Sequence, residues 1–338
     1  MRLAFYASME HYIDHLAPVW KALGADERTS FFTVPTLVPY AESLGIEAEP
    51  LPAWPKIREL IAVSAEGNRR QLGGRPVIRF EHGIGGSFGG LPPDGRVITG
   101  ASLNPSYAGG RGQANVKLFC NANHYPNDRW LAAYPKTPSE IVGTPKMDAW
   151  HNAPPKPRSD PPVVCVSFHF EATVCSEARS AFPHFRSGVA ELAKRRDIEL
   201  VGHAHPKGRK QLRPFFEKLG VPFIERFDEV LGVADLYAID HMSTLYEFAS
   251  LDRPVVVLNA PWYRRYIHHG LRFWEHSDVG VNCDRSDDLC AAVDRALEDP
   301  PAVRKARKAT TKDLYPFRGH AAEQAVKVLR EFAKRKSA

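Results

Sequence analysis

The segment ADLYAIDHMSTLYEFASLDRPVVV, residues 234–257, decides the fold of this chain and indicates a ligand site. Its pattern predicts a buried strand that ends on an acid, a polar turn, a short helix from Ser243, and a second buried strand opened by proline. Ser243 and Thr244 stand where backbone N–H groups lack helical partners and the helix dipole is positive, which suits a phosphate. Glu247 follows one turn later on the same face, where a carboxylate can accept hydrogen bonds from two ribose hydroxyls. This layout is typical of a nucleoside diphosphate site.

Length and composition indicate a soluble protein with room for two domains. The 338 residues are 43% hydrophobic and 25% charged, which is typical of globular chains. No apolar run approaches the roughly 18 residues of a membrane span, and the first residues are predicted to form a strand and not a signal peptide. Five cysteines without a C-x-x-C spacing argue against a disulfide framework and a structural zinc site. A cytoplasmic protein is the expectation.

Basic residues produce a net charge of +6 and gather near the C-terminus. One cluster lies within residues 304–312, and another closes the chain at residues 334–336. A solvated helix face is the main interpretation of such clusters. The alternatives are peripheral contact with an anionic surface, here the inner membrane surface, and attraction of nucleic acid or another anionic substrate.

The order of the predicted elements indicates an α/β fold with two Rossmann-like domains. Strands are expected at residues 1–8, 31–34, 76–80, 163–167, 198–201 and 255–258, and helices at 12–23, 38–44, 187–196, 286–297 and 321–332. This alternation predicts parallel sheets. Residues 153–162 are rich in proline, which continues neither regular structure, and are predicted to be a linker. The prediction is an N-terminal domain of residues 1–152 and a C-terminal domain of residues 163–318 that face each other across a cleft.

Polar residues follow the predicted strands of the C-terminal domain, where ligands of parallel sheets collect. Lys207 and Arg209 come shortly after one strand and carry charge for phosphate oxyanions. His203 and His205 precede them. Their H-x-H spacing also fits zinc or copper, although no third ligand stands at a recognisable spacing. The further candidates for this nucleotide site, which is expected to hold no metal, are Ser167 and His169.

A glycine-rich loop follows the strand predicted at residues 76–80. Glu81 and His82 open it, and five of the eight residues from 83 to 90 are glycine. Glycines let the backbone approach a ligand closely and form an anion-binding nest, and a carboxylate beside a histidine raises its basicity. The alternative is a loop with a structural histidine. The residues of this second candidate site are Glu81, His82, Gly83, Gly85 and Gly86.

Residues 262–274 are dense in aromatic and basic side chains. Arg265 is the candidate from this segment for a cleft residue, and ordinary interdomain packing is the alternative interpretation. Aromatic and basic side chains in alternation can also stack on nucleobases, so a nucleic-acid acceptor stays open. No helix-turn-helix, zinc-finger or RNA-recognition motif accompanies them.

The segment that starts at Asp240 resembles the CDP-glycerol glycerophosphotransferase (teichoic acid polymerase-like) family. Asp240, Ser243, Glu247 and the LDRP sequence of residues 251–254 match the motif of that family. Two further motifs, a His-Gly pair and a His-Pro pair, match at residues 82–83 and 205–206. The chain departs from the family pattern at Glu81, His241 and Met242.

The resemblance implies a glycosyltransferase-B architecture, in which a C-terminal helix over residues 319–335 crosses back to the first domain. It implies that His82 is the base for an attacking acceptor hydroxyl and that His205 lies against the phosphates of the donor. Asp240 is grouped with these two catalytic candidates, where it holds the turn or orients a neighbouring group.

The chain is therefore predicted to be a transferase that needs no metal or cofactor. It moves a glycerol-phosphate or glycosyl group from a CDP-glycerol-like donor or a UDP-linked sugar to the hydroxyl of a glycan, a polyol phosphate or modified DNA. The alternatives are a nucleotide-sugar glycosyltransferase of the same fold, a UDP-sugar 2-epimerase-like enzyme, and an inactive homologue that only binds nucleotides. The oligomeric state stays open.

Overall fold

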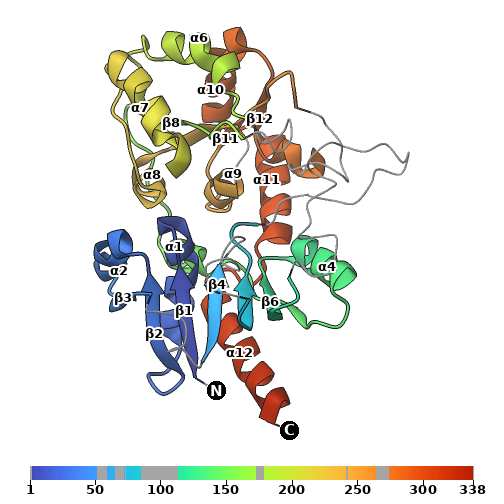
Figure 1. Ribbon diagram of the computed structural model, residues 1–338. Helices are drawn as coiled ribbons and strands as arrows, with labels where there is room; N and C mark the ends of the chain where they lie inside the picture. Colours follow the sequence, from blue (N-terminus) through green and yellow to red (C-terminus); the bar gives the residue numbers. More distant parts are fainter. Residues whose placement is uncertain are drawn as a thin grey trace. The chain divides into compact units, whose positions relative to one another are not determined.

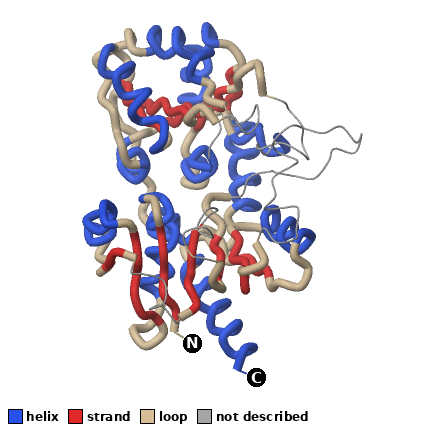
Figure 2. The backbone as a smooth tube through the Cα atoms, in the orientation of Figure 1, coloured by secondary structure: helices blue, strands red, loops and turns tan. Residues whose placement is uncertain are grey.

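The computed structural model describes residues 2–51, 59–64, 72, 74–84, 113–172, 179–240, 243–263 and 274–337. The chain forms two compact units, and each is built on one parallel β-sheet with helices beside it (Figure 1, Figure 2). Unit 1 contains residues 1–85, 105–153 and 314–338. Unit 2 contains residues 86–104 and 154–313.

The sheet of unit 1 has seven strands in the order β3-β2-β1-β4-β5-β6-β7. These strands are β1 (Leu3–Ala7), β2 (Arg28–Thr33), β3 (Ala48–Pro50), β4 (Leu60–Ser64), β5 (Val77–Phe80), β6 (Val116–Asn121) and β7 (Ser139–Ile141). The helical segments are α1 (Glu10–Ala22), η1 (Pro35–Leu37), α2 (Val38–Ser43), α4 (His124–Ala133), η5 (Pro145–Met147), α5 (Asp148–Asn152) and α12 (Ala321–Ser337). The strand order reverses between β1 and β4, which pair directly, so a ligand site is expected at their carboxyl ends.

Strand β1 places alternate side chains on the two faces of this sheet. Phe5 belongs to a buried cluster that also contains Trp20 of α1 and Leu329 of α12, and Tyr6 belongs to the cluster of the opposite face. Helix α12 is held at its start by the Asp148 carboxylate, which accepts hydrogen bonds from the backbone N–H groups of the first two residues of α12 at 2.9 and 2.7 Å. The last helix therefore packs against the same sheet as the first strand.

The sheet of unit 2 has five strands in the order β12-β11-β10-β8-β9. These strands are β8 (Val163–Phe168), β9 (Glu199–Ala204), β10 (Leu236–Ile239), β11 (Val255–Leu258) and β12 (Val281–Cys283). The helical segments are α6 (Phe182–Leu192), η7 (Pro206–Gly208), α7 (Arg209–Lys218), α8 (Phe227–Val233), α9 (Ser243–Ala249), η8 (Trp274–Val279), η9 (Ser286–Asp288), α10 (Leu289–Glu298) and α11 (Pro301–Leu314). The strand order reverses between β8 and β10.

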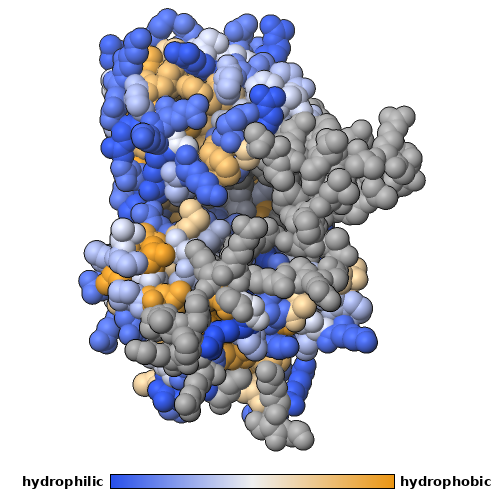
Figure 3. All heavy atoms as spheres, in the orientation of Figure 1, coloured by the Kyte–Doolittle hydropathy of each residue, from blue (hydrophilic) through white to orange (hydrophobic). Residues whose placement is uncertain are grey.

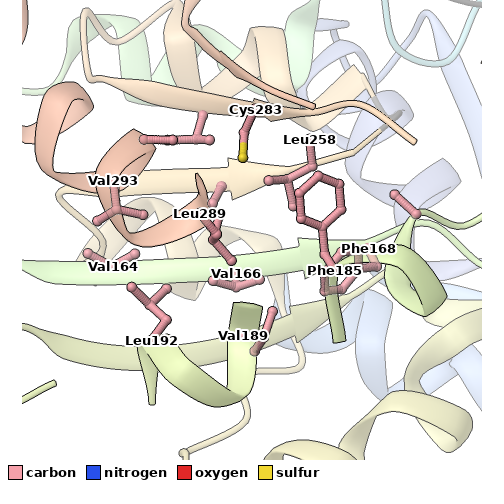
Figure 4. Packing of buried hydrophobic residues seen from close by; sticks show 14 of the residues in the cluster. Val164, Val166, Phe168, Phe185, Val189, Leu192, Leu258, Cys283, Leu289 and Val293 are labelled. Carbon is pink, nitrogen blue, oxygen red and sulfur yellow. The ribbon is translucent and has the colours of Figure 1, made fainter. Parts of the chain in front are cut away.

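One face of β8 forms the centre of the core of unit 2. Val164, Val166 and Phe168 pack against Phe185 and Val189 of α6 (Figure 4). Helix α6 begins at Phe182, five residues before the helix predicted at 187–196, because Pro183 suits a first helical turn. The predicted strands at 163–167 and 255–258 agree with β8 and β11 within one residue.

Part of the C-terminal basic cluster is paired within unit 2. Arg307 is fully buried and contacts the carboxylates of Asp252 and Asp299 at 2.9 and 2.8 Å. Arg304 and Lys308 also form ion pairs with Asp299 and Asp252. Hydrophilic side chains dominate the visible surface of the described part of unit 2 (Figure 3). Among the described residues, no helix has the length and apolar character needed to cross a membrane.

Candidate functional site

Residues from three adjacent strands meet at the carboxyl edge of unit 2. Ser167 on β8 is in register with His203 on β9 and with Ile239 on β10, and Asp240 follows Ile239 directly. The strand order reverses between β8 and β10, and ligands of open parallel sheets bind at such a point. Ser167 and Asp240 therefore lie at the edge where a ligand site is expected.

Asp240 holds both ends of the connection from β8 to α6. Its carboxylate is fully buried, and it accepts hydrogen bonds from the backbone N–H groups of His169 and Ala181, each at 2.8 Å. A buried carboxylate with two N–H donors is a strong, charge-assisted clamp. Of the two roles expected for Asp240, this geometry favours holding the turn.

A chain of hydroxyl and imidazole groups leads from buried Ser167 to half-buried Thr244 of α9. Ser167 Oγ lies 2.7 Å from His203 Nδ1, and the Tyr237 hydroxyl lies 3.3 Å from both His203 Nδ1 and Thr244 Oγ1. Burial lowers the pKa of His203 to about 3, with a smaller contribution from the charge of Arg209. Burial also raises the pKa of Tyr237. The His203 imidazole and the Tyr237 phenol are therefore both uncharged at neutral pH. The contact between the Tyr237 hydroxyl and Thr244 Oγ1 orients the Thr244 hydroxyl.

His203 was considered from the sequence only as half of an H-x-H metal pair, and Tyr237 was not among the predicted site residues. Tyr237 lies in a strand whose other residues are apolar, and a phenol in such a strand indicates a buried hydrogen bond. The sequence contains that signal, but it does not identify the partners of the hydroxyl.

The predicted phosphate-binding residues after β8 and β9 gather around an aromatic ring. The rings of His169 and His205 have centroids 5.1 Å apart, and Phe170 lies 4.7 Å from His205. The exposed Lys207 ammonium lies 5.1 Å from the centroid of Phe170. Arg209, the first residue of α7, has its guanidinium 4.0 Å from the carboxylate of Glu225, which lies between α7 and α8. Three of the four predicted residues thus share one half-exposed cluster.

Helix α9 begins at Ser243, as predicted. Ser243 and Thr244 are half-buried in its first turn, and Glu247 is fully buried one turn later. Burying a carboxylate is costly unless hydrogen bonds or positive charge compensate it.

The predictions for His241, Met242, Gly85, Gly86 and Arg265 lie outside the described residues.

The second candidate site lies at the carboxyl end of β5 in unit 1. Glu81 is almost fully buried, accepts a hydrogen bond from Trp130 Nε1 at 3.2 Å, and lies 3.6 Å from Arg79 Nη2. The Arg79 guanidinium stacks on Trp130 at 4.6 Å. Glu81 Oε1 lies 3.7 Å from His82 Nδ1, while the His82 side chain is 42% exposed. The carboxylate is therefore held in place and faces one nitrogen of an accessible imidazole.

Helix α1 lines the other side of His82. The ring centroids of His11 and Tyr12 lie 6.0 and 5.4 Å from that of His82. Gly83, which follows, has a φ of +74°, a left-handed conformation that favours glycine. Its backbone N–H donates to His15 Nε2 at 3.2 Å. The three predicted residues Glu81, His82 and Gly83 therefore lie together at the carboxyl end of β5.

Metal ligation has no support in the described part of the chain. Within it, no group of three or more histidine, cysteine, aspartate or glutamate side chains is arranged to hold a metal ion. His203 and His205, the pair with the H-x-H spacing, have separate environments, because His203 is buried against Ser167 and His205 contacts Phe170.

Known structures resemble this chain over nearly its whole length, although no protein-family model and no curated protein matches it in sequence. The UDP-GlcNAc 2-epimerase of Methanocaldococcus jannaschii, in complex with UDP-GlcNAc and UDP, has a TM-score of 0.64 at 15% identity, over 98% of this chain and 100% of that chain. The wall teichoic acid polymerase TagF with CDPG has a TM-score of 0.59 at 12% identity, over 99% of this chain and 89% of that chain.

The spinosyn rhamnosyltransferase SpnG, complexed with spinosyn aglycone, has a TM-score of 0.53 at 15% identity, over 97% of this chain and 100% of that chain. At such identities the likeness establishes the fold. The chain has the glycosyltransferase-B fold with two parallel-sheet α/β units, and the predicted fold class is confirmed. The resemblance to the CDP-glycerol glycerophosphotransferase family is supported at the level of this fold.

Proposed function

We propose that this chain is a transferase that moves a glycerol-phosphate or glycosyl group from a nucleotide-activated donor to a hydroxyl acceptor. The observation that carries the proposal is the cluster of His169, His205 and Lys207 after the carboxyl ends of β8 and β9, next to the point between β8 and β10 where the strand order reverses. Solved structures of this fold contain UDP-GlcNAc and UDP, or CDPG, which are nucleotide-linked compounds.

The donor would be held by unit 2. The ammonium of Lys207 and the imidazole of His205 would bind the oxygens of the two phosphates, where charge develops as the leaving group departs. Thr244, oriented by Tyr237, would donate a further hydrogen bond. The Glu247 carboxylate would accept hydrogen bonds from the ribose. These groups supply the positive charge and donors that the leaving phosphate requires, so the protein residues alone account for donor binding.

The acceptor would be activated in unit 1. His82 would take the proton of the acceptor hydroxyl, and the Glu81 carboxylate would stabilise the imidazolium that forms. With a CDP-glycerol-like donor, the hydroxyl oxygen bonds to the β-phosphorus and CMP leaves. With a nucleotide sugar, the oxygen bonds to the anomeric carbon and a nucleoside diphosphate leaves. The same base serves both reactions, and the acceptor classes are a glycan, a polyol phosphate or modified DNA.

Calorimetric titration with CDP, UDP, GDP and ADP is the direct test of the donor site. One diphosphate is expected to bind, and Glu247→Ala is expected to weaken its binding at least tenfold, because a hydrogen bond to a charged group contributes about 1.5–3 kcal/mol. Glu247→Gln keeps the shape of the side chain and one acceptor oxygen, so its affinity for the diphosphate is expected to lie between those of wild type and Glu247→Ala. Exposed Glu229 provides the control, and Glu229→Ala should bind like wild type. Failure of all four nucleotides to bind would refute the donor site.

A UDP-sugar 2-epimerase-like activity is the second candidate, and the fold of the Methanocaldococcus jannaschii enzyme supports it. The two reactions differ in their products. An epimerase converts a nucleotide sugar into its isomer without an acceptor, whereas a transferase releases the nucleotide only when an acceptor is present. Chromatography of the nucleotide products with and without acceptor separates the two.

Tyr237→Phe is expected to weaken nucleotide binding by about threefold, because a typical hydrogen bond contributes about 0.5–1.5 kcal/mol and Thr244 loses its orienting partner. Thr244→Val removes the hydroxyl itself and should cost more. If Tyr237 acts through Thr244, the double variant binds no more weakly than Thr244→Val alone. If the losses of binding free energy in the double-mutant cycle, measured by calorimetry, are additive, Tyr237 does not act through Thr244.

A further inference from the structure

His15 occupies a position at unit 1's candidate site that the proposed reaction does not yet use. It lies on α1 one turn after His11, so both rings project from the same side of the helix. Strand β1, which precedes α1, is separated from β5 only by β4. The turn that follows β5 therefore meets α1 at the carboxyl edge of the sheet. The His15 ring centroid lies 6.5 Å from that of His82, with the ring planes nearly perpendicular at 87°.

The contact between His15 and this turn has a defined direction. His15 Nε2 accepts the backbone N–H of Gly83 at 3.2 Å, so the proton of the neutral ring is on Nδ1. The bond reaches the residue directly after His82, at a left-handed backbone position. Next along the turn, the carbonyl of Ile84 accepts the side-chain N–H of Asn123 at 2.9 Å. Two buried side chains from other elements thus hold the backbone that presents His82.

The electrostatic surroundings keep His15 in the form that this bond needs. The residue is 5% exposed, and burial lowers its pKa well below the usual value for histidine. The neighbouring Lys146, His82 and His11 act in the same direction. A protonated His15 would donate from both ring nitrogens and could no longer accept the Gly83 N–H. The ring is therefore a neutral acceptor across the physiological pH range.

We infer that His15 is a positioning residue, which fixes the Gly83 backbone so that the His82 imidazole stays against Glu81 with its exposed part available to the acceptor. The inference rests on the proposed function, because the reaction that His82 serves belongs to that proposal. His15 touches neither reacting atom, and it acts only through the backbone of the turn. Its loss should therefore reduce the rate of proton transfer and leave donor binding in unit 2 unchanged.

The test compares His15→Gln, which has an amide oxygen near the place of Nε2, with His15→Leu, which has no acceptor. Hydrogen exchange at the Gly83 amide is measured by NMR in the ligand-free full-length protein, and kcat and KM are measured with the donor that the wild type uses. His15→Leu is expected to accelerate Gly83 exchange at least tenfold and to lower kcat at least tenfold, with the donor KM within twofold of wild type. His15→Gln is expected to restore most of both properties.

His151 supplies the control, since it is a second histidine of unit 1 with a lowered pKa, and it is partly buried. His151→Leu should leave Gly83 exchange and kcat as in wild type. Equal losses in His15→Gln and His15→Leu, or unchanged Gly83 exchange in His15→Leu, would overturn the inference. A wild-type protein that protects Gly83 but transfers no group from any nucleotide donor would instead refute the proposed function and the catalytic consequence of His15, while leaving the bond itself demonstrated.

Discussion

His82→Ala is expected to lower kcat by a factor of about 10² to 10⁴, because this is the usual contribution of a positioned general base. The imidazole is 42% exposed and has a buried carboxylate on one nitrogen, which is the arrangement a base requires. The measurement is release of nucleotide from the donor in the presence of acceptor. The dissociation constant of the nucleotide should change by less than about threefold. The residues proposed to bind the donor belong to unit 2, and His82→Ala removes none of their contacts.

Two further variants identify the origin of that loss. Glu81→Gln keeps the shape of the carboxylate but removes its charge, and should lower kcat by about tenfold, within the range of a neighbouring-charge effect. His320→Ala removes an exposed histidine of the same unit and should have no effect. If His82→Ala retains wild-type turnover, His82 is not the base. If wild type itself binds a nucleotide but gives no product, the chain is the inactive nucleotide-binding homologue.

Asp240→Ala is expected to lower the free energy of unfolding of unit 2 by about 3–5 kcal/mol, because one buried and one partly buried backbone N–H group lose a charged acceptor. The Asp240 carboxylate contacts both ends of the β8–α6 connection, so the loss is concentrated there. Hydrogen exchange at the amides of His169 and Ala181 measures the local effect, and urea unfolding measures the global one. Nucleotide binding should fall as well, since His169 belongs to the donor cluster.

Asp240→Asn offers one carbonyl oxygen and one amide group that cannot accept, so it should protect one of the two backbone amides and cost about half as much. Asp287→Ala is the control, because that carboxylate is highly exposed and such substitutions change stability by only about 0.5 kcal/mol. Unchanged protection of both amides in Asp240→Ala would show that other contacts hold this connection.

Local patterns were enough to predict much of unit 2. The alternation of apolar strands with proline and hydroxyl signals predicts β10, a helix from Ser243 and β11 within residues 234–257, and the structure agrees. Such signals work because strand and helix periods and end signals depend on residues a few positions apart. The strands β3, β4, β6 and β7 of unit 1 were not predicted. β3 and β7 have only three residues each, and β4 and β6 are almost entirely buried, so none of them shows the apolar–polar alternation that identifies a strand.

The partners of the candidate site residues could not be predicted in the same way. Glu81 and His82 are recognisable in the sequence as an acid beside a histidine, and Arg79 stands two residues before Glu81, but Trp130 becomes a neighbour of Glu81 only through the packing of α4. Likewise, Tyr237 meets Thr244 because β10 and α9 lie against each other.

The sequence by itself determined the α/β class, the positions of the polar residues after the strands and the hydroxyl-bearing start of α9. These properties depend on the periodicity and the end signals of residues that are close together in the chain. Only the tertiary structure decided that Asp240 clamps a loop, that His15 accepts the Gly83 N–H, and that the last helix, which the family resemblance places with the first domain, packs there against Trp20 of α1. The physical reason is that these contacts join residues 59, 68 or about 300 positions apart, and strand order, which no local pattern encodes, determines which of them meet.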